Sequence, residues 1–289
     1  QMDIGANLTD PMFKGEYHGK QKHENDLDLV IQRARNSNIQ KICITVGQLS
    51  DYKEALDIAQ KYNLNLTLGI HPTCADQCTN EALLTIDNIL QQKPKEILMY
   101  GEFGLDYERL QFSSKETQIS AFEKQLILAH KHNLPLFLHC RAAYADLISI
   151  LTNYQTTHNH QFSGVIHSFD GSQEDLQLVL KTQFLVGLNG CSFKTESNLA
   201  VAAKIPLERI LTESDCPWCD IRPTHAGFKF VKTKFEMVAK AEKWARIGVK
   251  GRNEVNGVVQ VEEVVAGLLG VEVEKVRAQV KENAKVIGW

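Results

Sequence analysis

Short apolar runs alternate along the chain with longer segments whose hydrophobic residues recur at helical spacing. Residues 26–37, 51–62 and 117–132 each place apolar side chains on one stripe, which predicts amphipathic helices. The apolar runs predict eight β-strands, at residues 2–7, 41–47, 64–70, 96–102, 134–140, 163–168, 184–190 and 209–214. This alternation of strand and helix is typical of βαβ units and a parallel sheet.

Eight strands, seven helices between them and a helical tail predict an α/β fold, a (β/α)8 TIM-type barrel that forms a single domain over residues 1–289. An open, doubly wound sheet is the alternative, but "GANLTD" after the first strand lacks the glycine-rich dinucleotide fingerprint. We interpret residues 216–252 as a long loop or helix after the eighth strand. Residues 255–289 are expected to be closing helices, joined near Gly270.

Four residues with metal-binding side chains stand where predicted strands end. Glu102, His139, His167 and Asp215 follow the fourth, fifth, sixth and eighth apolar runs. In a (β/α)8 barrel the carboxyl ends of the strands converge on one face, where active sites are built. Two imidazoles and two carboxylates on that face predict a site for zinc, manganese or another borderline to hard divalent ion.

Composition narrows the setting of this site. The chain is 43% hydrophobic and 23% charged, which is ordinary for a globular protein, and its net charge of −3 provides no general attraction for nucleic acid. No apolar stretch is long enough to span a bilayer, and we see no signal peptide. Seven cysteines without a disulfide rhythm favour an intracellular location, cytoplasmic or nuclear. Cys216 and Cys219 have the spacing of a redox pair, but two reduced cysteines in a loop are the favoured interpretation.

Several short motifs occur in a characteristic order: "DIGANLTD", "GIHP", "GEFGLDY", "LHCR", "IHSFDG", "GLNG", "TESDCPW" and "RNE". Together they resemble the TatD family of metal-dependent deoxyribonucleases, a branch of the amidohydrolase-like barrels, over almost the whole chain. The resemblance implies that Glu102 bridges metal ions and that His139 and His167 are further ligands. Asp215 would be both a ligand and the base that deprotonates the attacking water, and the substrate would be DNA.

The first strand departs from the commoner family pattern. Many relatives carry His-x-His there, and this chain has Gly5 and Asn7, as one subgroup of the family does. An amide oxygen is a poorer ligand than a neutral imidazole for borderline metals. We therefore expect one firmly held ion (Mg, Mn or Zn) and a weaker second ion with Asn7 among its ligands.

Further residues are expected to contact the substrate. His71 follows an apolar strand and is a candidate catalytic residue that reaches the phosphate or the leaving group. Residues 216–252 hold nine Lys or Arg and three acids, with aromatic residues among them. This mixture favours a groove for single-stranded DNA or frayed ends, and the alternative is a solvated helix whose aromatics pack on the barrel. The other predicted substrate contacts are Tyr107, Arg141, Glu213 (also a supporting residue), His225 and Arg252.

The sequence thus favours a DNase, a 3′-5′ exonuclease or an endonuclease. A hydrolase of a small cyclic amide, lactone or phosphoester is a second hypothesis, but the full His-x-His and a lysine that could carry a bridging carbamate are missing. A non-catalytic metal-binding scaffold is a third, and it would have no use for a proton acceptor such as Asp215.

Overall fold

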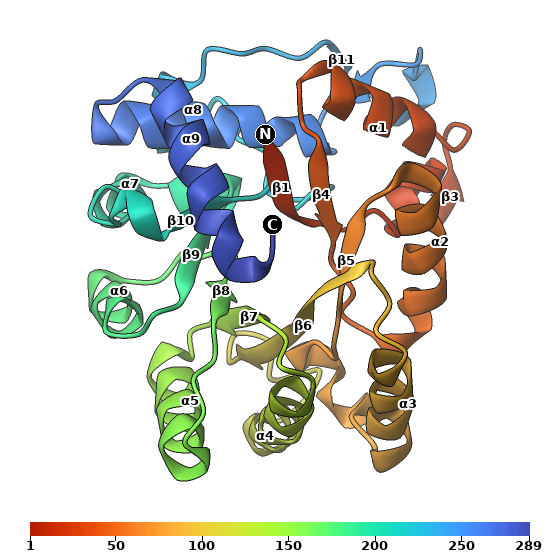
Figure 1. Ribbon diagram of the computed structural model, residues 1–289. Coiled ribbons are helices and arrows are strands. Elements are labelled where there is room, and N and C mark those ends of the chain that lie inside the picture. Colours follow the sequence, from red (N-terminus) through yellow and green to blue (C-terminus); the bar gives the residue numbers. More distant parts are fainter.

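The computed structural model describes residues 1–289 as a ring of eight parallel strands surrounded by helices (Figure 1). Each barrel strand pairs in parallel with the barrel strand that precedes it in the chain, so the predicted parallel barrel is confirmed. The strands are β1 (Met2–Ala6), β4 (Lys41–Ile44), β5 (Asn65–Leu68), β6 (Ile97–Asp106), β7 (Leu136–Arg141), β8 (Gly164–Ile166), β9 (Leu185–Leu188) and β10 (Ile210–Thr212). A short antiparallel hairpin, β2 (Glu16–Tyr17) and β3 (Lys20–Gln21), follows β1.

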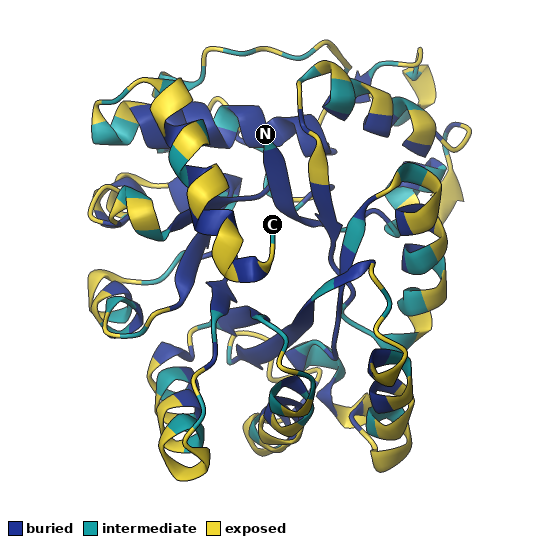
Figure 2. Ribbon diagram, in the orientation of Figure 1, coloured by how far each residue is buried: buried dark blue, intermediate teal, exposed yellow.

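Helices connect successive strands and bury one side against the barrel, while their outer sides are exposed (Figure 2). Those between the strands are α1 (Leu27–Asn36), α2 (Tyr52–Tyr62), α3 (Asn80–Gln91), α4 (Lys115–His132), α5 (Tyr144–His158), α6 (Gln173–Leu180) and α7 (Glu196–Ala202). Two closing helices follow, α8 (Val258–Leu269) and α9 (Val273–Asn283). Gly270 ends α8 with a φ of 63°, a left-handed conformation that favours glycine, at the junction predicted from the sequence. No helix is both long enough and apolar enough to span a membrane.

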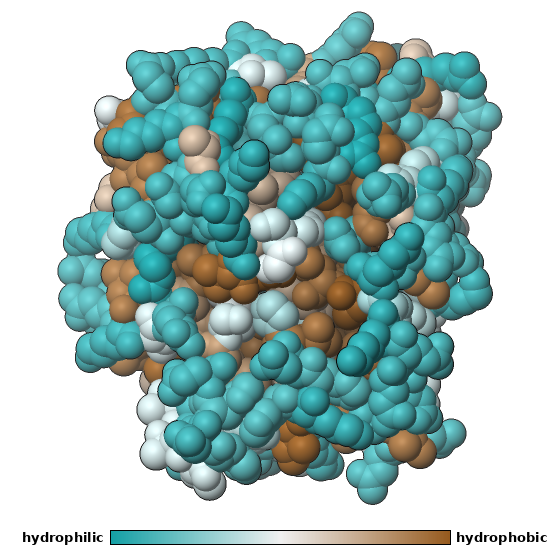
Figure 3. Space-filling view, in the orientation of Figure 1, coloured by the Kyte–Doolittle hydropathy of each residue, from teal (hydrophilic) through white to brown (hydrophobic).

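The carboxyl terminus lies at the end of the barrel where the strands begin. The Trp289 indole donates a hydrogen bond to Asn65 Oδ1 (2.9 Å) at the start of β5, and the Lys41 ammonium at the start of β4 lies over the same ring. A hydrophobic patch near the middle of the face in Figure 3 is bordered by hydrophilic residues. All eight barrel strands are parallel, so their carboxyl ends, which carry the candidate ligands, lie at the opposite end of the barrel from Trp289.

Hydrogen bonds between the end of β10 and β1 close the ring. The Asp215 N–H donates to the Gly5 carbonyl (2.9 Å), and the Asn7 N–H donates to the Cys216 carbonyl (2.8 Å). The Ser214 N–H donates to the buried Asp3 carboxyl (2.9 Å), which also accepts the Ser214 hydroxyl. These contacts place Asn7, which follows β1, beside Asp215, which follows β10.

The buried Asp3 carboxyl is expected to make stability depend on pH. Burial raises the pKa of Asp3 from 3.8 to about 8, partly offset by the bonds from Ser214 and Gly5. The folded protein therefore holds a proton between these values that the unfolded chain has released. Stability should fall as pH rises through this window, by up to about 1.4 kcal/mol per pH unit. In urea titrations from pH 4 to 8, the Asp3→Asn variant should gain stability relative to the unchanged protein as pH rises, and parallel profiles would contradict this.

The segment between β10 and α8 is a long loop without an α-helix. It contains three short 3-10 turns, Ala226–Phe230, Ala241–Lys243 and Val255–Gly257, and one pair of two-residue strands, β11 (Met237–Val238) and β12 (Gly248–Val249). Phe230 packs over Gly267 of α8, and Trp244 stacks on His23 with ring centroids 4.9 Å apart. These two aromatics therefore pack against the rest of the protein and do not line an open groove.

Candidate metal centre

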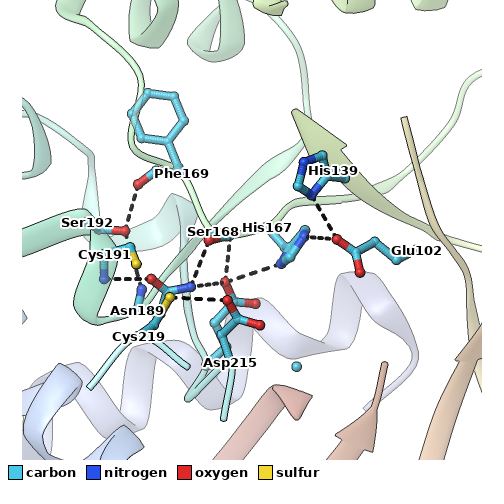
Figure 4. A network of polar contacts seen from close by, with 12 residues as sticks. Glu102, His139, His167, Ser168, Phe169, Asn189, Cys191, Ser192, Asp215 and Cys219 are labelled. Atoms are coloured by element: carbon cyan, nitrogen blue, oxygen red, sulfur yellow. Dashed lines mark hydrogen bonds and ion pairs between the residues drawn. The ribbon is translucent and has the colours of Figure 1, made fainter. Parts of the chain in front are cut away.

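The buried Glu102 carboxylate contacts several imidazoles, two of which, those of His139 and His167, are seen in Figure 4. Its Oε1 atom is 2.8 Å from His139 Nδ1, 2.6 Å from His167 Nε2 and 3.5 Å from His71 Nε2. One ligand atom from each of His71, Glu102 and His139 lies within 4.8 Å of the others. The structure thus brings together candidate ligands from β6, β7 and the end of β8, and these nitrogen and oxygen donors fit a divalent cation.

Two of the imidazoles that face Glu102, those of His139 and His167, have a second buried carboxylate behind them. His139 Nε2 is 3.2 Å from Asp106 Oδ2, and His167 Nδ1 is 3.5 Å from Glu213 Oε1. Carboxylates behind metal-binding histidines fix the orientation of the ring and its protonation state. Asp106 is not among the ligands or supporting residues predicted from the sequence, although its spacing of four from Glu102 puts it on the same side of an extended strand.

The negative charge of the Glu102 carboxylate is balanced by the imidazoles that surround it. Burial opposes ionisation of Glu102, but the charge of His167, together with hydrogen bonds from His139 and His167, keeps its pKa well below the ordinary value. Burial likewise opposes protonation of His167, while Glu102 and Glu213 raise its pKa well above the ordinary value. A cation bound beside Glu102 would take the place of the imidazolium protons as its positive partner.

Asp215 lies on the β1 side of the same region. Its Oδ1 accepts a hydrogen bond from Asn7 Nδ2 (3.0 Å), and its Oδ2 accepts one from the Cys219 thiol (3.2 Å; Figure 4). Burial raises the pKa of Asp215 to about 6, partly offset by His167, so its affinity for a proton exceeds that of an ordinary aspartate. Asn7 uses its amide nitrogen for Asp215 and the Cys216 carbonyl (3.1 Å), which leaves only its amide oxygen as a possible metal ligand.

The tautomer of His71 follows from its contacts. Its Nδ1 accepts a hydrogen bond from the Thr73 N–H (3.1 Å), at the start of the 3-10 turn Pro72–Gln77. Burial lowers the pKa of His71 to about 3, so the ring is neutral and its single proton lies on Nε2, which faces Glu102. His71 is therefore a hydrogen-bond donor directed into the cluster.

Two predicted substrate contacts are wrong because the side chains are fully buried. Arg252 pairs with Asp26 and Glu254, with N–O distances of 2.7 and 2.8 Å, and its side chain has no exposed surface. Glu213 also has no exposed surface, and it accepts hydrogen bonds from the Ser168 N–H (2.6 Å) and Asn189 Nδ2 (3.2 Å). Both residues support the structure, so only the supporting role predicted for Glu213 is retained.

The other predicted substrate contacts remain accessible. The Tyr107 hydroxyl donates to Asp146 Oδ2 (2.8 Å), and Arg141 pairs with Asp170. His225 is partly exposed in the loop after β10, where its Nδ1 accepts the Arg222 N–H (3.3 Å). All seven cysteines are free thiols.

Removing the carboxylate behind His139 should weaken metal binding. We expect Asp106→Asn to lower the affinity for Mn²⁺ or Zn²⁺ about 10- to 100-fold, because the imidazole loses the partner that orients it. Competition with a chromophoric chelator measures this affinity. Asp146→Asn is the matched control, since Asp146 bonds Tyr107 and Lys115 and contacts no candidate ligand. Equal affinities in the two variants would refute a role for Asp106 in holding the ring.

The sequence model of one family, the TatD related DNases, matches residues 2–287. The chain belongs to the TatD family. It is 40% identical to the deoxyribonuclease Tat-D of Schizosaccharomyces pombe, over 98% of this chain and 93% of that protein. It is 30% identical to the 3′-5′ ssDNA/RNA exonuclease TatD of Erwinia amylovora, over 99% and 98% of the two chains. The crystal structure of a TatD family hydrolase from Entamoeba histolytica superposes with a TM-score of 0.93 at 36% identity, covering 99% and 97% of the two chains.

Gly5 of this TatD chain lies against the carboxylate that supports His167. A Cβ atom added to Gly5 would stand 2.9 Å from Glu213 Oε2 and 3.1 Å from Phe137 Cζ. A side chain at position 5 would therefore displace the Glu213 carboxylate, which lies behind His167, and the Phe137 ring. Gly5 and the buried glutamate belong to the same local arrangement.

Proposed function

We propose that this TatD family member is a metal-dependent hydrolase that cleaves phosphodiester bonds of DNA with an activated water molecule. The observation that carries the proposal is the Glu102 carboxylate shared among imidazoles where the barrel strands end. The names of the relatives support the substrate, since one is a deoxyribonuclease and another a 3′-5′ ssDNA/RNA exonuclease. The finer proposal is a 3′-5′ exonuclease activity, with or without endonuclease activity, on single strands or frayed ends.

Glu102, His139, His167 and Asp215 would hold the cation. When bound, a divalent ion lowers the pKa of a coordinated water and neutralises phosphoryl charge. Asp215 accepts the proton of the attacking water, a contribution of typically about 10²- to 10⁴-fold. The Asn7 amide and the Cys219 thiol hold its carboxylate in place through the bonds to Oδ1 and Oδ2.

His71 completes the proposed chemistry on the other side of Glu102. Its neutral ring presents Nε2–H to the cluster, so it donates to a phosphoryl oxygen or to the leaving oxygen. Mg, Mn and Zn are the candidate ions, with one firm site and a weaker second site that includes the Asn7 oxygen. A cytoplasmic or nuclear location is part of the same proposal.

The test is cleavage of end-labelled single- and double-stranded DNA by protein stripped of metal and re-supplied with Mg²⁺, Mn²⁺ or Zn²⁺. We expect metal-dependent cleavage that is faster on single strands, with a product ladder that shortens from the 3′ end. Circular single-stranded DNA separates the endonuclease from the exonuclease, because only an endonuclease cuts it. Folded protein that cleaves no DNA with any of these ions would refute the proposed function.

A further inference from the structure

Trp218 is a large apolar side chain that the fold leaves open to solvent beside the candidate base. Its relative exposure is 51%, whereas Cys216, two residues earlier, is buried. Trp218 also differs from Trp244, which stacks on His23, and from Trp289, which bonds Asn65. An exposed indole contributes little to a folded core, so this one is available to a ligand.

The backbone keeps Trp218 close to Asp215. The Trp218 N–H donates to the Asp215 carbonyl (3.0 Å), which closes a four-residue turn, and the next residue returns its thiol to the Asp215 carboxylate. Such a turn holds its first and last Cα atoms within about 7 Å. The Trp218 backbone is therefore held next to Asp215, so a nucleotide bound at Asp215 lies close to position 218.

A cation flanks this turn. Lys194 is exposed and follows the 3-10 turn Gly190–Phe193 after β9. A Cβ added to Gly190 would stand 1.9 Å from the Cys219 carbonyl oxygen, so that 3-10 turn packs directly on the turn that carries Trp218. The Lys194 carbonyl also accepts the Ala226 N–H (3.0 Å), which ties it to the loop that contains His225. An ammonium group in this position suits the phosphate of a neighbouring nucleotide.

We propose that Trp218 and Lys194 form a subsite for one unpaired nucleotide next to the scissile phosphate, in which the base stacks on the indole and a phosphate binds the ammonium group. Stacking on an aromatic side chain tolerates any base, because every base presents a π face. The subsite requires a base free of its partner strand, which gives a physical reason for single-strand preference. The inference rests on the proposed function for the identity of the substrate.

Binding without chemistry is the first test. Oligodeoxythymidylate added in EDTA should quench the tryptophan fluorescence of the unchanged protein, and the quenching should be largely lost in Trp218→Phe. Fluorescence anisotropy should show that Trp218→Phe still binds, since a phenyl ring also stacks. Trp218→Ala should bind about 5- to 150-fold more weakly, the factor that corresponds to the stacking of one base. Unchanged quenching in Trp218→Phe, or unchanged binding in Trp218→Ala, would overturn the proposal.

Abasic scanning is the second test. Each oligonucleotide of a series lacks the base at one position, and the position moves along the strand. At the position that meets Trp218, loss of the base should raise the KM of the unchanged protein but leave the KM of Trp218→Ala unchanged. Lys194→Ala should retain that base dependence and bind more weakly at low salt. Leu84→Ala, which removes an exposed apolar side chain of α3, should match the unchanged protein. If the unchanged protein cleaves DNA but Trp218→Ala keeps the same abasic profile, the subsite is wrong and the proposed function stands. If no metal supports cleavage, the quenching in EDTA still tests the subsite alone.

Discussion

Replacing Asp215 by asparagine is expected to lower kcat on single-stranded DNA by about 10²- to 10⁴-fold, the usual contribution of a positioned general base. An amide cannot accept the proton of the attacking water, although its oxygen can still face a metal ion. Bound metal and the melting temperature should therefore change little. Initial rates on an end-labelled oligonucleotide, with elemental analysis of the same samples, measure both quantities.

The neighbouring Asn7 provides the matched control for this experiment. Asn7→Ala removes the hydrogen bond to Asp215 Oδ1 but leaves the carboxylate in place, so kcat should fall by a much smaller factor. Activity that survives in Asp215→Asn would show that another group accepts the proton. Loss of metal together with activity would show that Asp215 acts chiefly as a ligand.

Substituting Arg252 should affect stability and leave catalysis in the folded molecules intact. Its guanidinium pairs with Asp26 and Glu254, and all three side chains are at most 6% exposed. Arg252→Leu leaves two buried carboxylates without this partner, and breaking a buried pair typically costs about 3–5 kcal/mol. Urea titration measures this loss as a lower free energy of unfolding.

Arg222→Leu is the matched control, because Arg222 pairs with Asp220 on the surface with 58% of its own side chain exposed. Surface pairs contribute about 0–1 kcal/mol, so its unfolding curve should nearly coincide with that of the unchanged protein. A raised KM for DNA in Arg252→Leu, without loss of stability, would restore the substrate contact that the structure contradicts.

The sequence predicted the barrel well because each strand and helix carries its own local hydrophobic period. The positions of Glu102, His139, His167 and Asp215 followed from the same pattern, since strand ends of a parallel barrel converge. Asp106 was missed because the fourth predicted strand stopped at Glu102, whereas β6 continues to Asp106. Had the strand been extended, its alternation would have placed Asp106 on the side of Glu102.

The errors at Arg252 and Glu213 have a different origin. Arg252 meets Asp26, which is 226 residues away in the chain, and Glu213 meets Ser168, which is 45 residues away. No local period reports such partners, so a charged residue near a motif could not be distinguished from one that faces the substrate. For His71 the sequence predicted a catalytic role but not the tautomer of the ring. The tautomer follows from the hydrogen bond that the Thr73 N–H donates to Nδ1, which depends on the backbone of the turn.

The contact between Gly5 and Glu213 couples the backbone at the end of the first strand to the support behind His167. A histidine introduced at position 5 would meet Glu213 Oε2 and Phe137 before it could bind an ion. Loss of Glu213 alone would leave His167 without its rear partner. A redesign of this centre therefore has to change the first strand, Glu213 and the packing around Phe137 together.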